Sequence, residues 1–196
     1  MAIFPIFPIF IFIFIVVLII IYRFKGPRLI PVRAYDGRVY MVLPSLENRD
    51  EQEAANKLAG LRAKLVQLIN DLQHSKEFSL EDKKLLKTRF KALLSENSPG
   101  GRHTSYTVNK GEHIYMCIRP DLKENMNVKF EDDNVLMFVA LHELAHVMTR
   151  TIGHQRDFKE NFRMLLKQAE KRGYYKYHPF HIKPRPYCGT VISSLP

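Results

Sequence analysis

The chain has 196 residues, of which 46% are hydrophobic and 26% charged, and its 30 Lys and Arg against 20 Asp and Glu give a formal net charge of +10. This length suits one compact domain and leaves little room for a second. So high an apolar content excludes a wholly disordered chain. The two cysteines, Cys117 and Cys188, are too few for a disulfide scaffold and too distant for a Cys-x-x-Cys site. We therefore expect both to be unpaired thiols in a reducing compartment.

The first 22 residues contain no charged side chain, and Ala2 to Tyr22 are mostly Ile, Phe and Val. As a helix rising about 1.5 Å per residue, this run would cross the roughly 30 Å hydrocarbon core of a bilayer once. A cleavable signal peptide is the alternative, but no Lys or Arg precedes the run and no small-x-small cleavage site follows it before Arg23. The sequence therefore predicts a transmembrane anchor over 1–24, with residues 2–22 in contact with lipid.

A basic strip follows the apolar run, and only Asp36 opposes it. Its cations are Arg23, Lys25, Arg28, Arg33 and Arg38. The positive-inside bias then places the N-terminus outside and the C-terminal domain in the cytosol, for a single-pass protein of a cellular membrane or of a virion inner membrane.

Two further segments precede the C-terminal half. Residues 25–44 are expected to form a basic linker with a short strand at 38–43, after the Asp36-Gly37 turn. Residues 45–98 are expected to form a helical pair, with one helix over 48–74 and a second from Ser79 that continues through Leu94. The first helix has leucines at spacings of three and four, namely Leu58, Leu61, Leu65, Leu68 and Leu72. This seam favours core packing, with helix-mediated self-association as the alternative.

The last expected unit, 99–196, begins with a β-hairpin at 106–119 that turns at Asn109-Lys110-Gly111. Asp132 and Asp133 then suit the start of a helix over 135–149, which is apolar nearly all round and should be buried. A second helix is expected over 157–172, and a strand over 187–192. The predicted class is α+β, with a small sheet and a buried central helix, preceded by a helical pair and one transmembrane helix.

The buried helix contains His142-Glu143-Leu144-Ala145-His146. Histidines four residues apart project from one face of a helix, so both imidazoles can reach one metal ion, and Glu143 lies beside them as a general base. The alternative is a pair of buried, hydrogen-bonded histidines. We favour the metal site, because three polar groups in an apolar helix would each cost about 1 to 3 kcal/mol without partners.

A zinc site needs a third protein ligand and an open position. His154 is the first candidate, because Gly153 permits a sharp turn back toward His146. Glu160 and Glu170 on the following helix are the alternatives. Four of the other five histidines, His103, His113, His178 and His181, are expected at the surface or in loops, and not at a second metal site.

The His-Glu-Leu-Ala-His motif followed by Gly153, His154 and Phe158 resembles the zincin metallopeptidases of the WLM and SprT-like groups, over approximately residues 105–175. The full layout, with a Tyr187-Cys188-Gly189 tail, is similar to WLM-like proteins of large nucleocytoplasmic DNA viruses. The resemblance implies a zincin-like fold and a Zn²⁺ cofactor held by His142, His146 and His154.

The same resemblance implies hydrolysis of peptide bonds in a protein or peptide substrate, with Glu143 as the catalytic base for a zinc-activated water. A strand of the hairpin could pair with the extended substrate. Aromatic packing is the expected role of Tyr174, Tyr175 and Tyr177, with donation to the oxyanion by one of them as the alternative. The leading hypothesis is thus a membrane-anchored zinc metallopeptidase.

Two other functions compete with this hypothesis. The first is a catalytically silent or latent zincin-fold structural protein of a membrane or virion shell, with shell proteins as partners, although Glu143 is intact. The second is a DNA-associated protease of the SprT-like kind, suggested by the net charge. We do not expect a nucleic-acid partner, because the sequence has no zinc finger and no basic cluster interleaved with aromatic residues.

Overall fold

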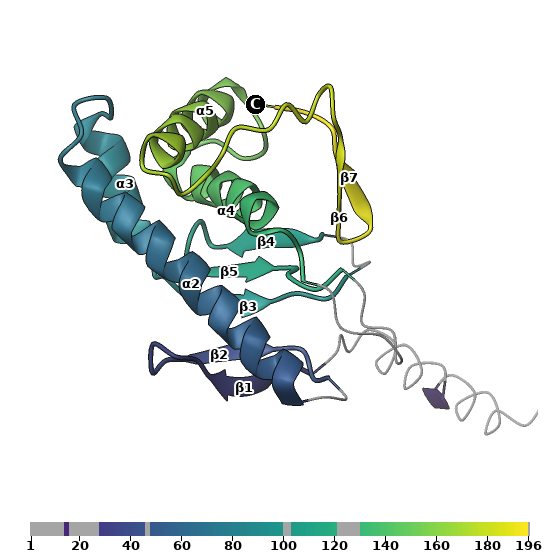
Figure 1. The fold of residues 1–196 in the computed structure, drawn as a ribbon. Helices are drawn as coiled ribbons and strands as arrows, with labels where there is room; N and C mark the ends of the chain where they lie inside the picture. The colour runs from purple at the N-terminus through teal and green to yellow at the C-terminus, as the bar shows by residue number, and fades with distance from the viewer. Residues whose placement is uncertain (1–13, 16–27, 46–47, 100–102, 121–129, 196) are drawn as a thin grey trace, which may run out of the picture.

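A computed structural model describes residues 14–15, 28–45, 48–99, 103–120 and 130–195. Within these ranges the chain forms one five-stranded sheet, a group of helices and a separate two-stranded hairpin (Figure 1). The predicted α+β class is confirmed. The expected division into anchor, linker, helical pair and core stays a prediction, although strands from three of these segments share the one sheet.

The five-stranded sheet has the order β1-β2-β3-β5-β4, so the strands at its two edges are β1 and β4. The strand pairs β1–β2 and β4–β5 are antiparallel, whereas β2–β3 and β3–β5 are parallel. Its members are β1 (Ile30–Arg33), β2 (Val39–Val42), β3 (Leu94–Glu96), β4 (Ser105–Val108) and β5 (His113–Met116). The strand expected at 38–43 is β2, the inner arm of the β1–β2 hairpin at one edge of the sheet, and the hairpin expected at 106–119 lies at the opposite edge.

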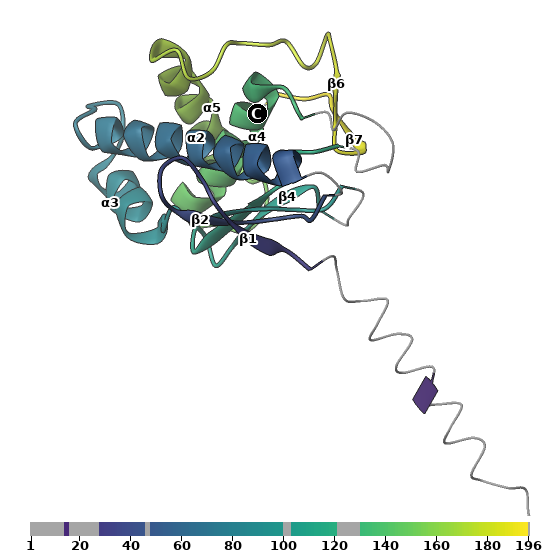
Figure 2. The same cartoon turned by 60° about the horizontal axis from the view of Figure 1, so that its bottom comes forward.

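The helices gather on one face of this sheet (Figure 2). They are α2 (Asn48–Gln73), α3 (Leu80–Arg89), α4 (Asp133–Met148) and α5 (Arg156–Lys171). Helix α2 contacts β1, β2 and β3, whereas α4 contacts β4 at the edge and α5 packs on α4. Helix α4 is thus enclosed between the sheet and the other helices, which explains why its sequence is apolar nearly all round.

The leucine seam of α2 faces the core, because each of its five leucines is at most 7% exposed. Leu58, Leu65, Leu68 and Leu72 are completely buried. The prediction of core packing is therefore confirmed, and the seam is not available for self-association. Burial of this kind contributes about 1.5 to 3 kcal/mol for each leucine side chain.

The second predicted helix was too long. Ser79 caps α3 as expected, with its side chain accepting from the backbone N–H of Asp82, but the helix ends at Arg89. Phe90 has extended backbone angles, and Leu94 lies in β3, between β2 and β5. The sequence prediction counted Leu94 as part of the apolar helix face, because a residue buried in a three-residue strand gives no periodicity of its own.

Helices α4 and α5 begin and end within two residues of their predicted limits. The expected final strand is instead a hairpin of β6 (Arg185–Tyr187) and β7 (Thr190–Ile192). Its turn has positive φ at Cys188 and Gly189, at 46° and 84°. This hairpin stands apart from the main sheet, and the chain then returns toward α5 (Figure 1).

Apart from residues 14 and 15, the predicted anchor over 1–24 lies outside the described residues. Among the helices of the described part, none combines the length and apolarity needed to cross a bilayer.

The expectation of unpaired cysteines is wrong. Cys117, directly after β5, forms a disulfide with Cys188 in the β6–β7 turn, across 71 positions of sequence. Both residues are buried, at 0% and 1% exposure. Two isolated cysteines this far apart carry no sequence signal of pairing, because only the tertiary fold brings them within the 6.3 Å between Cα atoms that the bond spans.

Candidate metal centre and catalytic cleft

Helix α4 carries the first part of the site. Asp132 is its N-cap, with a side-chain oxygen that accepts from the backbone N–H groups of Asn134 and Val135. Twelve of the sixteen residues of α4 are buried, so its position is fixed by packing on all sides. His142 and His146 are half-buried on the same face, with ring centroids 4.9 Å apart. The predicted arrangement of these two histidines is therefore present in the structure.

His154 completes a triad of imidazoles. Its Nε2 lies 3.0 Å from Nε2 of His142, and its ring centroid is 4.9 Å from that of His146. Gly153 has φ of +80°, a value that a residue with a side chain adopts only at a cost, and this turn brings His154 back over α4. One ligand atom from each histidine lies within 4.8 Å of the others.

Phe158, on the first turn of α5, packs against all three rings. Its ring centroid is 4.3 Å from that of His146, 4.6 Å from that of His154 and 4.9 Å from that of His142. The side chain is only 2% exposed, so it forms a fixed apolar support for the imidazoles. This explains the physical role of the aromatic residue four positions after His154.

The geometry suits a tetrahedral metal ion. With Zn–N bonds of about 2.1 Å, two ligand nitrogens of such a site lie roughly 3.4 Å apart, close to the 3.0 Å between His142 and His154. Burial, followed by the neighbouring histidines, lowers the pKa of His142 to about 3. Burial, His154 and Lys110 lower the pKa of His146 to about 4. At neutral pH both are therefore neutral, which is the form of histidine that binds metals.

Glu143 lies beside the triad and is only 4% exposed. Burial raises the pKa of its carboxyl group to about 8, while a hydrogen bond from the backbone N–H of Thr107 acts in the opposite direction. Thr107 belongs to β4, the edge strand next to α4. The carboxyl group is thus held between the helix and the sheet edge, next to the imidazoles.

Lys110 connects the β4–β5 turn to the loop that delivers His154. Its ammonium group donates to the backbone carbonyls of Thr149 and Thr151, each at 3.0 Å, and to that of Arg150. The turn itself fits closely on α4, because a Cβ atom at Gly111 would come within 2.8 Å of Val147. Lys110 therefore fixes the α4 C-terminus and the start of the His154 loop together.

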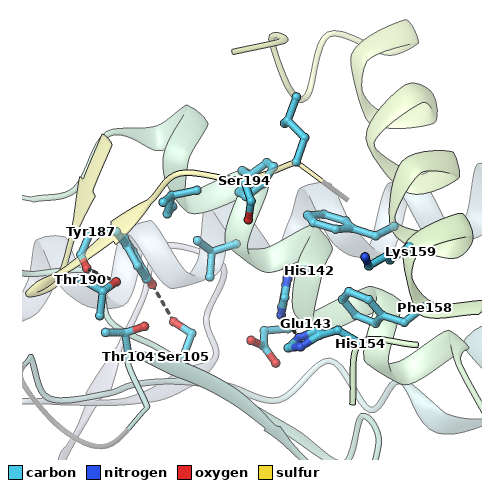
Figure 3. Close-up of a pocket in the computed structure, with 15 residues that line it drawn as sticks. Thr104, Ser105, His142, Glu143, His154, Phe158, Lys159, Tyr187, Thr190 and Ser194 are labelled. Atoms are coloured by element: carbon cyan, nitrogen blue, oxygen red, sulfur yellow. Dashed lines mark hydrogen bonds between the residues drawn. The ribbon is translucent and has the colours of Figure 1, made fainter. Parts of the chain in front are cut away.

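The triad lies between two hollows that together form a cleft. On one side are β4 and the loop residues Thr151 to His154, with His103 and Lys110 at the rim. The lining on the other side includes Phe138 and Phe162. Figure 3 shows this hollow, with His142 and Glu143 on one side and Thr190 and Ser194 of the C-terminal segment on another. Residues that line both hollows are Thr104, Ser105, His142, Glu143, His154 and Thr190.

The alternative third ligands lie elsewhere. Glu160 pairs with Arg156 at 2.7 Å, and Glu170 accepts from the backbone N–H of Tyr177 at 3.3 Å. The tyrosines proposed as oxyanion donors, Tyr174, Tyr175 and Tyr177, line neither hollow. Tyr175 packs on Phe138, with ring centroids 6.1 Å apart, which is the aromatic packing that the sequence analysis favoured.

Sequence reasoning missed Tyr187, which does line the cleft. Its hydroxyl donates to the carbonyl of Cys117 at 2.8 Å and lies 2.6 Å from Oγ of Ser105 (Figure 3). Because the one phenolic proton is used by Cys117, Tyr187 holds its own segment against β4 and has no proton left to donate into the cleft. A tyrosine 44 positions after Glu143 gave no local signal of this contact.

Comparison with solved structures finds partial similarity to Wss1 from Saccharomyces cerevisiae. A Wss1 mutant aligns with a TM-score of 0.48 and 24% identity, covering 68% of this chain and 92% of the other. A second Wss1 structure aligns with a TM-score of 0.40 and 23% identity, covering 67% of this chain and 89% of the other. At these values the similarity says nothing about activity.

No family model matches the chain. Similar sequences include uncharacterized proteins of viruses. An uncharacterized protein of Invertebrate iridescent virus 3, 042R, is 49% identical over 71 residues, which are 36% of this chain and 42% of the relative. The uncharacterized protein R325 of Acanthamoeba polyphaga mimivirus is 31% identical over 154 residues, which are 76% of each chain. The chain therefore belongs to the same family as the mimivirus protein R325.

Proposed function

We propose that this chain is a membrane-anchored, zinc-dependent metallopeptidase. The observation that carries the proposal is the convergence of His142, His146 and His154, with nitrogens within 4.8 Å of one another, beside the buried carboxyl group of Glu143 in an open cleft. A buried pair of hydrogen-bonded histidines would not need a third imidazole from a separate loop. The Nε2 atoms of His142 and His154, 3.0 Å apart, also lie at a separation that suits two ligands of one cation.

A zinc ion in this site would polarise the scissile carbonyl and lower the pKa of a water molecule. Glu143 would accept a proton from the attacking water and return it to the leaving amine, and its buried position beside the triad supports this role. The exposed edge of β4 is available to hold an extended peptide by backbone pairing, next to Glu143. Phe158 keeps the imidazoles in place during these steps.

The membrane part of the proposal rests on residues 2–22 alone. We place the C-terminal domain in the cytosol because of the basic strip after this run, with a virion inner membrane as one location. The disulfide between Cys117 and Cys188 counts against a reducing compartment, because disulfides rarely persist there. Protease protection of the full chain in sealed vesicles shows on which side of the membrane the C-terminal domain lies. Release of the full chain from membranes by alkaline carbonate would contradict the proposed anchor.

The enzyme proposal is tested on the full chain purified in detergent. We expect about one zinc per chain by elemental analysis, and hydrolysis of unfolded casein that stops with a chelator and returns with added zinc. Zinc retained in the double variant His142→Ala/His146→Ala would contradict the site. A zinc-loaded chain that cleaves no peptide would support the alternative function, a silent zincin-fold structural protein of a membrane or virion shell.

A further inference from the structure

The hollow on the Phe138 side of the triad has both polar and apolar lining. Its polar lining includes Thr104 and Ser105, together with His142 and Glu143 of α4. Its apolar lining begins beside His142, at Phe158 and Phe162, and also includes Phe138, Val139, Ile192 and Leu195. Among the described residues that line it, only Glu143 carries a carboxyl group. The volume of the hollow, about 460 Å³, is in the range of pockets that hold small ligands.

The C-terminal segment 190–195 forms one wall of this hollow. Thr190 and Ile192 of β7 line the hollow, whereas Val191 between them is 63% exposed and does not. This alternation is that of a β-strand with one face toward the cavity. After β7, Ser194 continues the wall and Leu195 packs against the core, so that the chain passes over the hollow toward α5 (Figure 3).

Long-range bonds hold this wall in place. The disulfide joins the β6–β7 turn to the residue after β5, and the Tyr187 hydroxyl donates to the same residue, Cys117. The backbone N–H of Cys188 donates to the carboxylate of Glu131 at 2.9 Å. Since β6 and β7 have only three residues each, these bonds and not the hairpin's own ladder fix its position.

We propose that this hollow binds one bulky apolar side chain of the peptide substrate, next to the bond that is cleaved, and that Ile192 and Leu195 determine this selectivity. The inference rests on the proposed peptidase function, because the hollow opens onto His142 and Glu143. A side chain such as Leu or Phe would replace water against the aromatic rings. Asp would lose its hydration against the same rings, and the cation that also lines the hollow, Lys159, belongs to an exposed residue, where pairing with a carboxylate recovers little of that loss.

The test uses blocked peptides of sequence Ala-Ala-Gly-Xaa-Ala-Ala, with Leu, Phe, Gly or Asp as the variable residue. Binding is measured by calorimetry to the zinc-loaded full chain carrying Glu143→Gln, which is expected not to hydrolyse them. We expect the Leu and Phe peptides to bind at least tenfold more tightly than the Gly and Asp peptides, as burial of one apolar side chain implies.

Two variants in this background locate the selectivity. Ile192→Ser and Leu195→Ser should each reduce the preference for Leu over Gly to threefold or less, with the zinc content and melting temperature unchanged. Val191→Ser is the matched control, on the same strand but on its exposed face, and should keep the full preference. Because Ile192 and Leu195 are only partly buried near the C-terminus, both variants are expected to fold.

The outcomes separate this inference from the proposed function. Equal binding of all four peptides, no detectable binding, or the same effect of Ile192→Ser and Val191→Ser would overturn the inference. Selective binding without any cleavage by the parent chain would overturn the peptidase function and leave the apolar site in place.

Discussion

Helix α4 and the β6–β7 hairpin both line the cleft, but they are held in place by different kinds of contact. Helix α4 supplies His142, Glu143 and His146 from one turn and a half of a helix whose burial fixes their direction. The hairpin supplies Thr190 and Ile192 from short strands that are held by contacts distant in sequence. Ser105 and Tyr187 are 82 positions apart, and the disulfide spans 71.

The groups that would react and the residues that shape the cleft therefore depend on different parts of the chain. His142, Glu143 and His146 lie close together along α4, so their positions depend on the burial of that one helix. The wall depends on a covalent bond and a few hydrogen bonds, so it can be altered without disturbing the histidines. Variants in the two regions should therefore have different effects on metal binding and on stability.

The largest effect is expected at the histidine that joins the two helices. His154→Ala removes one of the three imidazole nitrogens that would bind the metal, so metal affinity should fall by more than about a hundredfold. This loss is larger than that expected when a residue that only supports a ligand is removed. Competition with a chromophoric chelator measures this affinity. Glu160→Gln is the control, because Glu160 pairs with Arg156 away from the triad and should leave the affinity unchanged. A metal affinity lowered by Glu160→Gln and not by His154→Ala would reassign the third ligand.

The next effect concerns the hairpin. Cys117→Ala/Cys188→Ala removes a cross-link over 71 positions, and the free energy of unfolding should fall by about 2 to 4 kcal/mol. Urea unfolding followed by circular dichroism measures this loss. Because neither cysteine belongs to the triad, zinc affinity should change by less than threefold. A loss of zinc equal to that of His154→Ala would mean that the two regions are not independent.

A smaller effect is expected at Lys110, which links the hairpin turn of β4 and β5 to the His154 loop. Lys110→Met removes three donated hydrogen bonds to backbone carbonyls and should weaken zinc binding by about tenfold. Lys110→Arg, which keeps a cation and several donors, should recover part of this loss. The visible spectrum of the cobalt-substituted chain reports on ligand geometry and should change in Lys110→Met. An unchanged spectrum and affinity would limit Lys110 to a structural role.

The sequence was most informative where a feature repeats or lies within a few residues. The leucine spacing of α2, the capping residues Ser79 and Asp132, and the His142 to His146 motif each depend on neighbours along one helix, and the structure places all of them as predicted. The position of His154 could also be predicted from the sequence. Gly153 before it permits the sharp turn toward His146, and the structure has φ of +80° at this glycine.

What the sequence could not show depends on contacts between distant segments. Leu94 belongs to a strand of three residues between two others, which is too short to carry a period. The pairing of Cys117 with Cys188 and the position of Tyr187 follow from the path of the last twenty residues around the cleft. Whether a tyrosine of this segment reaches the cleft depends on such contacts as well, and Tyr174, Tyr175 and Tyr177 line neither hollow.

Glu143→Gln tests the central claim most directly, because it separates the base from the metal ligands. The substitution keeps the size of the side chain and removes its ability to accept a proton, so peptide hydrolysis should fall at least a hundredfold. Zinc content and melting temperature should stay at the parent values, because the triad does not include Glu143. Hydrolysis by zinc-loaded Glu143→Gln at the parent rate would contradict the account.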